Sequence, residues 1–252
     1  MTIESMEELA GLQRAGALVA STLNSMKDAV EPGMTTRELD GIGARLLEKA
    51  GARSAPALTY QFPGVTCISV NEEAAHGIPG RKTIRRGDLI NIDVSCELDG
   101  FFADTGASFV FGHADARVQR LLKATRRALR DAMGQCRSGR PLNQIGRSIA
   151  KTARRTGHTV IENLSSHGVG RALHEEPKEI PSYYDPTDRR RMRKGMVFTI
   201  EPFLSTGARQ VQTAADGWTL YTDRMYRTAQ YEHTIVVNDD RPPTVITRNH
   251  WF

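Results

Sequence analysis

The stretch DLINIDVSCELDGFFADTGASFVF, residues 88–111, decides the fold. Two strand-like apolar runs flank the dipeptide Asp99-Gly100, which is typical of a two-residue turn between antiparallel strands. If this dipeptide forms the turn, the numbers of directly opposed residues sum to 199. Asp93 then faces Gly106, and Asp104 lies two positions away from Gly106. We therefore expect the two carboxylates on one face as diagonal neighbours, about 7 Å apart at Cα.

Acidic side chains on such a face indicate a metal site. Asp93 and Asp104 repel each other, and burying them is costly unless a cation lies between them. Two further acids lie in strand-like apolar segments, Glu201 in VFTIEP and Glu232 in AQYEHTIVV. Any one of these acids alone would more often be structural, but four carboxylates with histidines nearby suit Mn, Fe, Co or Zn. Shared carboxylates favour two ions, whereas a structural zinc site would use cysteines.

The order of predicted elements occurs twice. Gly33 to Gly51 and Gly139 to Gly157 both span 18 residues, and RRGDLINID before the first acid resembles RKGMVFTIE before the second. Chance is a rival explanation because Gly and basic residues are common, but the agreement in element order weighs against it. The repeat of 106 to 108 residues predicts related halves, about 1–112 and 113–252. Each half has helices on one side of an antiparallel sheet, and both close into a single catalytic domain over 1–252.

Local patterns predict the individual elements. Helical spacing of apolar residues covers 9–26 and about 115–135, and a second helix follows each of these. Thr35 and Glu38 form a capping box at the start of the second helix. Strands are predicted for VTCISV, HTVIENL, GMVFTIEPFL and AQYEHTIVV, residues 65–70, 158–164, 195–204 and 229–237.

Composition narrows the class of protein. The 252 residues contain no apolar run of the roughly 20 residues that a membrane span needs and no signal peptide pattern. Three widely spaced cysteines argue for a reducing compartment, so we expect a cytoplasmic protein. The net charge is +5, with basic runs such as 188–194. These runs form a solvated face or attract an anionic surface such as RNA, and without interleaved aromatic residues they do not indicate a specific nucleic-acid module.

The stretch SSHGVGRALHEEP, residues 165–177, places His167 and His174 seven residues apart among glycines. Either histidine alone would more often be an ordinary loop residue. Together with NEEAAHGIPG, NIDV, GFFADTG, FTIEP and AQYEHTIVV, however, this stretch resembles the type I methionine aminopeptidases. These stretches occur in the order of that family and span residues 71–237. The resemblance implies the pita-bread fold, an α+β architecture of two pseudo-symmetric halves with antiparallel sheet covered by helices. The resemblance is to the bacterial type of this family, which has no N-terminal extension.

The resemblance also implies site residues. The implied metal ligands are Asp93, Asp104, His167, Glu201 and Glu232. Two divalent ions (Co, Mn, Fe or Zn) would hold a bridging hydroxide that attacks the first peptide carbonyl. Glu201 would transfer the proton, His174 would stabilise the oxyanion and His76 would contact the scissile amide. By family position, the methionine pocket would be formed by Phe62, Cys67, Leu173 and Trp218, which would otherwise be taken for ordinary core residues.

The implied function is removal of the initiator methionine from nascent chains whose second residue is small. The expected enzyme is a cytoplasmic monomer that meets nascent N-termini, with the ribosome surface as a further partner and neither membrane nor specific DNA binding. Family members often have Gly and Phe where this chain has Ser166 and Leu173, and an aromatic residue where it has Thr59. We expect these departures to change pocket size and rate but not the ligands.

Two alternatives stay open at this point. The first is an Xaa-Pro peptidase of the same fold, such as aminopeptidase P or prolidase, although those enzymes usually carry an extra N-terminal domain. The second is a catalytically inactive pita-bread protein that binds RNA or ribosomes, although such proteins lose ligands and this chain has all five. A comparison of the cleavage of Met-Ala-Ser with that of an Xaa-Pro peptide distinguishes the three hypotheses.

Overall fold

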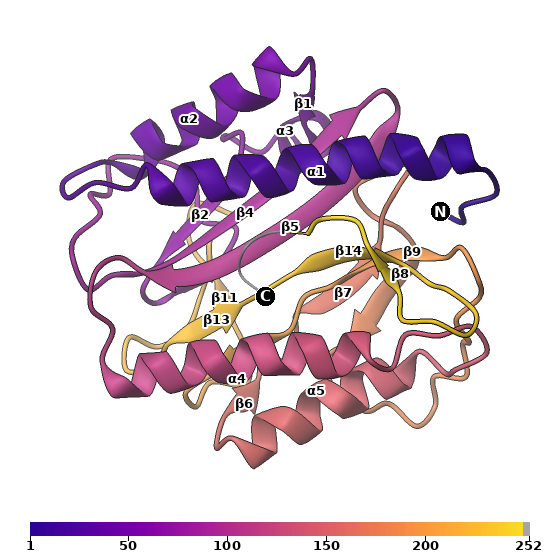
Figure 1. Cartoon of the computed structure of the whole chain (residues 1–252). Helices are drawn as coiled ribbons and strands as arrows, with labels where there is room; N and C mark the ends of the chain where they lie inside the picture. The colour runs from indigo at the N-terminus through magenta and orange to yellow at the C-terminus, as the bar shows by residue number, and fades with distance from the viewer. Residues whose placement is uncertain (249–252) are drawn as a thin grey trace.

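Two pairs of helices enclose the β-strands in the structure, a computed structural model that describes residues 1–248 (Figure 1). The first pair is α1 (Met6–Asp28) and α2 (Thr36–Lys49), and the second is α4 (Ala116–Met133) and α5 (Asn143–Arg155). The short α3 (Ala55–Tyr60) follows directly after the first strand, Arg53–Ser54, and was not predicted. The α+β class is confirmed. The boundary proposed near residue 112 falls in the connection between β5 and α4.

The helices α1 to α4 each begin at a side chain that accepts a free backbone N–H group, whereas α5 has no such cap. Ser5 caps α1 by accepting from the Glu8 amide, and the predicted capping box of Thr35 and Glu38 is present at α2. The apolar stripe of α1, including Leu12, is completely buried against β4 and β5. The amphipathic patterns therefore face the sheets, as the spacing of apolar residues predicts.

Within residues 1–248, the strands form four antiparallel sheets rather than one sheet in each half. One sheet has the order β1-β4-β2 with β5 paired to β4, and another has the order β15-β14-β9-β7-β8. Two three-stranded sheets have the orders β13-β10-β6 and β11-β12-β3. The strands are β1 (Arg53–Ser54), β2 (Cys67–Val70), β3 (Glu73–Ala75), β4 (Leu89–Leu98), β5 (Phe101–Val110), β6 (Thr159–Val160), β7 (Ser165–Gly168), β8 (Glu175–Pro181), β9 (Val197–Ile200), β10 (Phe203–Ser205), β11 (Gln212–Thr213), β12 (Leu220–Tyr221), β13 (Thr228–Gln230), β14 (His233–Val236) and β15 (Thr244–Val245).

The hairpin of β4 and β5 has the predicted register. Asp99 and Gly100 have φ values of 53° and 82°, which a two-residue turn of type I′ requires at both positions. Asp93 pairs with Gly106, and Asp104 pairs with Ser95, two places farther along the strand. Both carboxylates therefore lie on the same face, as the sum of 199 predicts.

The acid-bearing strands of the second half are interrupted, so the prediction of two continuous strands there was wrong. Residues 195–204 form β9 and β10, which belong to different sheets, and Glu201-Pro202 lies between them. A proline has no N–H to donate to a strand partner, which favours the break at this point. Residues 229–237 likewise divide into β13 and β14 around Tyr231-Glu232. Both glutamates therefore lie where the chain passes from one sheet to another.

The predicted strand over residues 158–164 was also mostly wrong. Only Thr159–Val160 is a strand, β6. The following residues keep some backbone hydrogen bonds, from the Ile161 amide to the Phe203 carbonyl and from the Glu162 amide to the Arg209 carbonyl, without regular pairing. This segment continues to Asn163 and Leu164, which reach the cavity described below.

The two halves are joined through β5 and the chain around Glu232. The amide of Glu232 donates to the Gly106 carbonyl, and the Thr105 hydroxyl donates to the Glu232 carbonyl. The Thr234 hydroxyl accepts from the Asp104 amide and donates to the Asp104 carbonyl. These groups are buried, so the hydrogen bonds hold the acid-bearing segments of both halves at a fixed separation. Within residues 1–248, no helix is both long and apolar enough to cross a membrane.

Two helical glycines lead to a prediction about packing. A Cβ at Gly146 of α5 would lie 2.1 Å from the Tyr183 carbonyl oxygen, whereas a Cβ at Gly41 of α2 would have its nearest neighbour at 3.5 Å, the end of the Arg45 side chain. We expect Gly146→Ala to lower the free energy of unfolding by about 1–3 kcal/mol, because backbone must move. Gly41→Ala should raise it by about 0.5–1 kcal/mol through helix propensity. Urea denaturation of both variants measures this, and equal signs would contradict the packing.

Candidate metal centre and active site

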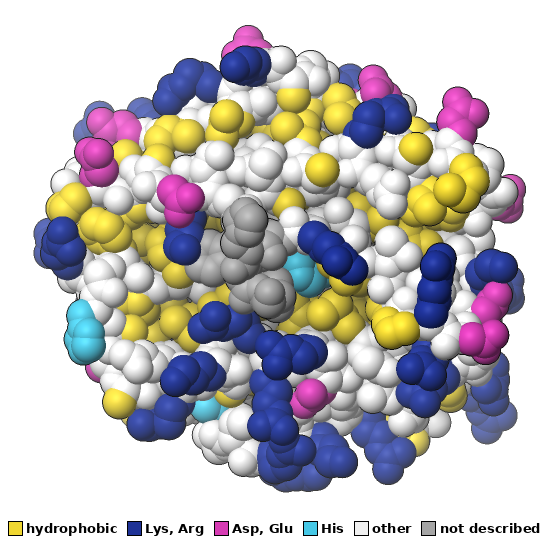
Figure 2. All heavy atoms as spheres, viewed as in Figure 1, with side chains coloured by type: hydrophobic (Ala, Val, Ile, Leu, Met, Phe, Trp, Pro, Cys, Tyr) yellow, Lys and Arg dark blue, Asp and Glu magenta, His cyan; other side chains and the backbone are white. Residues whose placement is uncertain are grey.

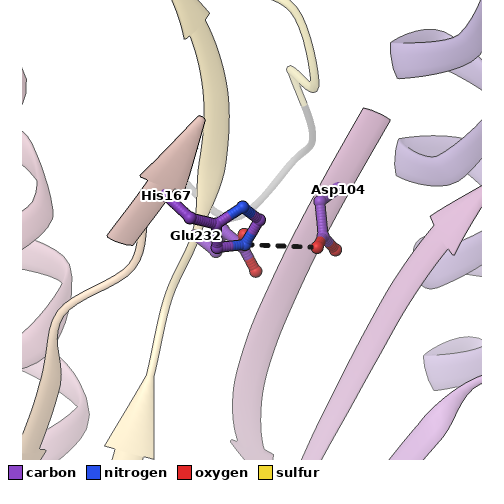
Figure 3. Close-up of side chains that lie close together, drawn as sticks. All are labelled: Asp104, His167 and Glu232. Carbon is purple, nitrogen blue, oxygen red and sulfur yellow. Dashed lines mark ion pairs between the residues drawn. The ribbon is translucent and has the colours of Figure 1, made fainter. Parts of the chain in front are cut away.

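Side chains from both halves of the chain meet where the sheets of the two halves come together. Asp93 and Asp104 come from β4 and β5, His167 from β7, and Glu201 and Glu232 from the two strand breaks. His167 Nε2 lies 3.3 Å from Glu201 Oε1 and 3.9 Å from Asp104 Oδ2. Potential ligand atoms of Asp104, His167 and Glu232 all lie within 4.8 Å of one another, and Figure 3 shows the three side chains converging from separate segments of the chain. Five residues expected to be ligands thus lie around one space.

Burial changes the protonation of this cluster. Burial, followed by the charges of the neighbouring carboxylates, raises the pKa of Asp104 and Glu232 well above the usual range. Burial raises the pKa of Glu201 to about 8 and also raises that of Asp93. Burial lowers the pKa of His167 to about 3, so its ring is neutral at pH 7. The imidazole is thus already in the neutral form that a divalent cation needs in a ligand, whereas the carboxyl groups with raised pKa must lose their protons when a cation binds.

Two buried carboxylate oxygens test whether the cluster fits a cation. Asp104 Oδ1 and Glu232 Oε1 have no hydrogen-bond partner within the described part of the chain, although both atoms are buried. Leaving such atoms unpaired is costly, and nearly all buried polar atoms in proteins have a partner. Ligation by an ion would satisfy both atoms. The donor set of carboxylates with one imidazole suits Mn, Fe, Co or Zn, so the residues fit the expected metals.

A buried glutamine, which the sequence reasoning missed, orients two of the carboxylates. Gln230 Nε2 donates to Asp93 Oδ2 at 3.2 Å and to Glu232 Oε2 at 3.0 Å, and Gln230 Oε1 accepts from Asn91 Nδ2 at 2.8 Å. Gly106 leaves room for this amide, since a Cβ there would lie 2.2 Å from Gln230 Oε1. The signal was present in the sequence, because Gln230 and Asn91 each lie two residues before an acid, on the same strand face.

Two hydroxyl groups orient the remaining ligands. The Thr199 hydroxyl donates to Glu201 Oε1 at 2.7 Å and accepts from the His167 amide at 3.1 Å. Ser166, where family members often have glycine, accepts from the Glu201 amide at 3.0 Å. This departure therefore adds a hydrogen bond that holds the backbone of a ligand. Such hydrogen bonds behind the ligands commonly tune metal affinity.

Two further histidines line the open side of the cluster. The His174 ring lies over that of His167, with centroids 3.9 Å apart and planes inclined by 38°. Burial and then the charge of His76 lower the pKa of His174 to about 4, although part of its ring faces the open cleft. Burial also lowers the pKa of His76, whose backbone φ of 53° is in the left-handed region. Both imidazoles are neutral at pH 7 and can each donate one hydrogen bond into the cleft.

A cavity of about 220 Å³ opens beside these groups. All four residues expected to form the side-chain pocket line it, namely Phe62, Cys67, Leu173 and Trp218. Phe62 and Trp218 make an edge-to-face contact with centroids 5.3 Å apart, and burial raises the pKa of the Cys67 thiol well above its usual range. The part of the wall that these four residues form is therefore neutral and largely apolar, as a thioether side chain requires.

Other residues of the cavity wall were not expected. Pro56, Tyr60 and Phe203 also line the cavity. Thr59, where an aromatic pocket residue is common in the family, is exposed and is absent from the wall, whereas the next residue, Tyr60, contributes its ring. No sequence pattern indicated Tyr60, because the short helix that carries it has no periodicity to detect.

Comparisons with known proteins agree with this geometry. The family model for metallopeptidase family M24 matches residues 10–239. A curated relative, methionine aminopeptidase 2 of Bacillus subtilis (strain 168), is 47% identical over 243 residues, covering 96% of this chain and 98% of the relative. The crystal structure of a methionine aminopeptidase from Thermotoga maritima superposes with a TM-score of 0.93 at 32% identity, covering 99% of this chain and all of that one. The pita-bread fold expected from the sequence is confirmed.

A similarity to prolidases concerns the fold alone. The prolidase from Pyrococcus furiosus matches with a TM-score of 0.78 at 20% identity, and the match covers 99% of this chain but 66% of the prolidase. Identity at this level carries no information about the substrate.

The division of roles between ligands and neighbouring histidines predicts different effects on metal binding. Asp104→Ala should weaken Co²⁺ or Mn²⁺ binding more than about 100-fold, because loss of groups behind the ligands alone typically costs about 10- to 100-fold. His174→Ala should change the affinity less than about 3-fold, since it contacts a ligand without being one. Isothermal titration calorimetry on metal-stripped protein measures both, with circular dichroism as a check of folding. Loss of binding in a folded His174→Ala variant would reverse the roles of the two histidines.

Proposed function

We infer the activity of this chain from two findings. The chain belongs to metallopeptidase family M24, and the five expected ligands lie together between its two halves. It is a methionyl aminopeptidase, a metal-dependent hydrolase that removes an N-terminal methionine. The observation that carries this function is the position of the five expected ligands beside a neutral apolar cavity. The near full-length similarity to methionine aminopeptidases supports the same activity.

We propose that the five residues divide between two ions. Asp93 would hold one ion, His167 and Glu201 the other, and Asp104 and Glu232 would serve both. When bound, divalent ions lower the pKa of a water molecule and polarise the peptide carbonyl. The carboxylates and the neutral imidazole of His167 are suited to this task by charge and by burial.

The surrounding side chains supply the rest of the chemistry. His174 would donate a hydrogen bond to the carbonyl oxygen as negative charge develops there, and His76 would contact the scissile amide. Glu201 would accept a proton from the attacking water at a carboxylate oxygen and deliver it to the leaving amine. The walls formed by Phe62 and Leu173, both buried, keep bulk water away from the side-chain pocket.

Selectivity follows from the closed side-chain pocket. A methionine side chain fills a cavity walled by Phe62, Cys67, Leu173 and Trp218, so the free amine and the carbonyl are held near the carboxylates. The second residue then passes the rim, where a bulky side chain would displace the carbonyl. A misplacement of about 1 Å can cost about 100-fold in rate. We therefore propose that only small second residues are accepted: Gly, Ala, Ser, Thr, Cys, Pro or Val.

The two alternatives have weaker support. An Xaa-Pro peptidase is favoured only by fold similarity at 20% identity. A non-catalytic RNA-binding protein would have lost ligands, whereas this chain keeps all five. We place the enzyme in the cytoplasm as a monomer, where initiator methionines are exposed on nascent chains.

We also propose that the face of α4 and α5 binds ribosomal RNA close to nascent chains. Residues 116–155 hold 12 of the 34 Lys and Arg residues and one of the 29 Asp and Glu residues. Residues 116–155 thus have a net charge of +11. Since the whole chain has a net charge of +5, the remaining residues have a net charge of −6. Figure 2 shows dark blue side chains gathered over these helices, while acidic groups lie mostly elsewhere on the visible face. Such a field attracts polyphosphate and weakens steeply with salt.

Peptide cleavage tests the activity and the rim together. We expect Met-Ala-Ser to be cleaved with a kcat/KM at least about 100-fold above that of Met-Arg-Ser, and an Xaa-Pro peptide without N-terminal Met to be resistant. Activity should disappear on thorough chelation and return with Co²⁺, Mn²⁺ or Fe²⁺. Equal rates for Met-Ala-Ser and Met-Arg-Ser would rule out the narrow rim. Full activity after complete metal removal would rule out the metal mechanism.

Charge reversal tests the proposed RNA contact. The triple substitution Arg120→Glu, Lys123→Glu and Arg130→Glu on α4 should raise the dissociation constant for ribosomes at least about 10-fold at low salt, because phosphate contacts dominate such binding. The control carries the same change of charge at exposed positions away from this face: Arg37→Glu, Lys49→Glu and Arg81→Glu. Co-sedimentation at several salt concentrations measures both. Equal losses in the two variants would attribute binding to net charge rather than to this face.

A further inference from the structure

Tyr60 approaches the proposed oxyanion donor from across the cleft. Its hydroxyl oxygen lies 2.8 Å from His174 Nδ1, and the two ring centroids are 5.5 Å apart. The residues are 114 positions apart in sequence and belong to different halves of the chain. Neither the expected site residues nor the metal ligands include Tyr60.

The short helix α3 holds Tyr60 in place. The Ser54 hydroxyl accepts from the Ala57 amide at the start of this helix and donates to the Val65 carbonyl at 2.7 Å. At the other end, Gln61 has a φ of 58°, and its amide donates to the Ala57 carbonyl. The left-handed turn ends the helix directly after Tyr60 and directs the chain to Phe62 in the pocket wall. The hydroxyl is thus presented from a fixed element and not from a free loop.

The chemistry of the pair sets the direction of the hydrogen bond. A phenol is a good donor and a weak acceptor, whereas the unprotonated nitrogen of a neutral imidazole is a strong acceptor. The favoured arrangement has the Tyr60 hydroxyl donating to His174 Nδ1. The ring proton of His174 then lies on Nε2, because a neutral imidazole carries only one proton.

The stack on His167 and the contact with Tyr60 restrain different motions of the His174 ring. Stacking at a centroid distance of 3.9 Å holds the plane of the ring but does not distinguish its two nitrogens. The hydroxyl distinguishes them. A ring flipped by half a turn loses the hydrogen bond, and a proton on Nδ1 would reverse it, with the phenol oxygen as the weaker acceptor. This is the way in which a partner on one imidazole nitrogen decides what the other nitrogen can do.

We propose that Tyr60 is a positioning residue that keeps the proton of His174 on Nε2, where it can be donated to the substrate carbonyl oxygen. The proposal rests on the proposed function for its kinetic consequence, but not for the tautomer itself. Tyr60 does not touch the reacting atoms in this scheme. It acts only through His174, and its half-exposed ring remains at the rim of the cavity.

The tautomer is measured directly by nitrogen NMR. Full-length protein labelled with ¹⁵N-histidine and loaded with diamagnetic Zn²⁺ reports which nitrogen of His174 carries the proton. We expect Nε2–H in the wild type and a mixture of both tautomers in Tyr60→Phe. The matched control Tyr221→Phe removes a hydroxyl that donates to Gln212 at 3.1 Å, away from the cleft, and should leave the His174 signals unchanged. A wild-type proton on Nδ1, or identical tautomers in the wild type and Tyr60→Phe, would overturn the proposal.

Kinetics provide the second readout. With Met-Ala-Ser, Tyr60→Phe should lower kcat about 10-fold and change KM less than about 2-fold, less than the roughly 100-fold or larger cost of losing an oxyanion donor outright. In a His174→Ala background the same substitution should have almost no further effect, because the residue through which it acts is gone. Full additivity in the double variant would contradict the proposal. If the wild type does not cleave the peptide at all, the proposed function fails, and the NMR result still decides the role of Tyr60.

Discussion

Repulsion among four buried carboxylates is the constraint on which the rest of the structure depends. Asp93, Asp104, Glu201 and Glu232 share one space, and burial, followed by the charges of the neighbouring carboxylates, raises the cost of ionising Asp104 and Glu232. Hydrogen bonds from Gln230 and Thr199 compensate only part of this cost, since two carboxylate oxygens have no hydrogen-bond partner among residues 1–248. The cluster is stable either with protons or with cations in place, and binding of metal ions must therefore release protons.

The scaffold resists this repulsion by two different constructions. In the first half, both acids belong to one continuous hairpin, whose register fixes their separation. In the second half, each acid occupies a break between strands of different sheets. The Glu201 amide donates to the Ser166 hydroxyl and the Glu232 amide donates to the Gly106 carbonyl, which holds the backbone there. A break directs a side chain at an angle that a regular strand does not allow. The two constructions thus bring acids to one place from opposite directions.

The features that could be predicted from the sequence are those caused by interactions between residues close together in the chain. The hairpin register could be derived because a two-residue turn and a strict period of two determine it locally. The break at Glu232 could not, because that segment is apolar enough for a continuous strand and the change of sheet depends on distant partners, whereas Pro202 was an overlooked local signal for the break at Glu201. The expected ligand set came from motif resemblance, whereas Tyr60 stayed hidden, since its contact with His174 crosses 114 residues and no local pattern marks it.

The division of the cluster between two halves has a consequence during synthesis of the chain. Asp93 and Asp104 leave the ribosome more than 100 residues before Glu201 and Glu232, respectively. At about 5–20 residues per second, the first pair waits roughly 5–20 s for its partners. Through that interval the hairpin presents its acids to water and holds no complete ligand set. A growing chain is consequently inert as a peptidase, and hydrolytic capacity arises in one late step, when the last acid-bearing segment pairs with β5.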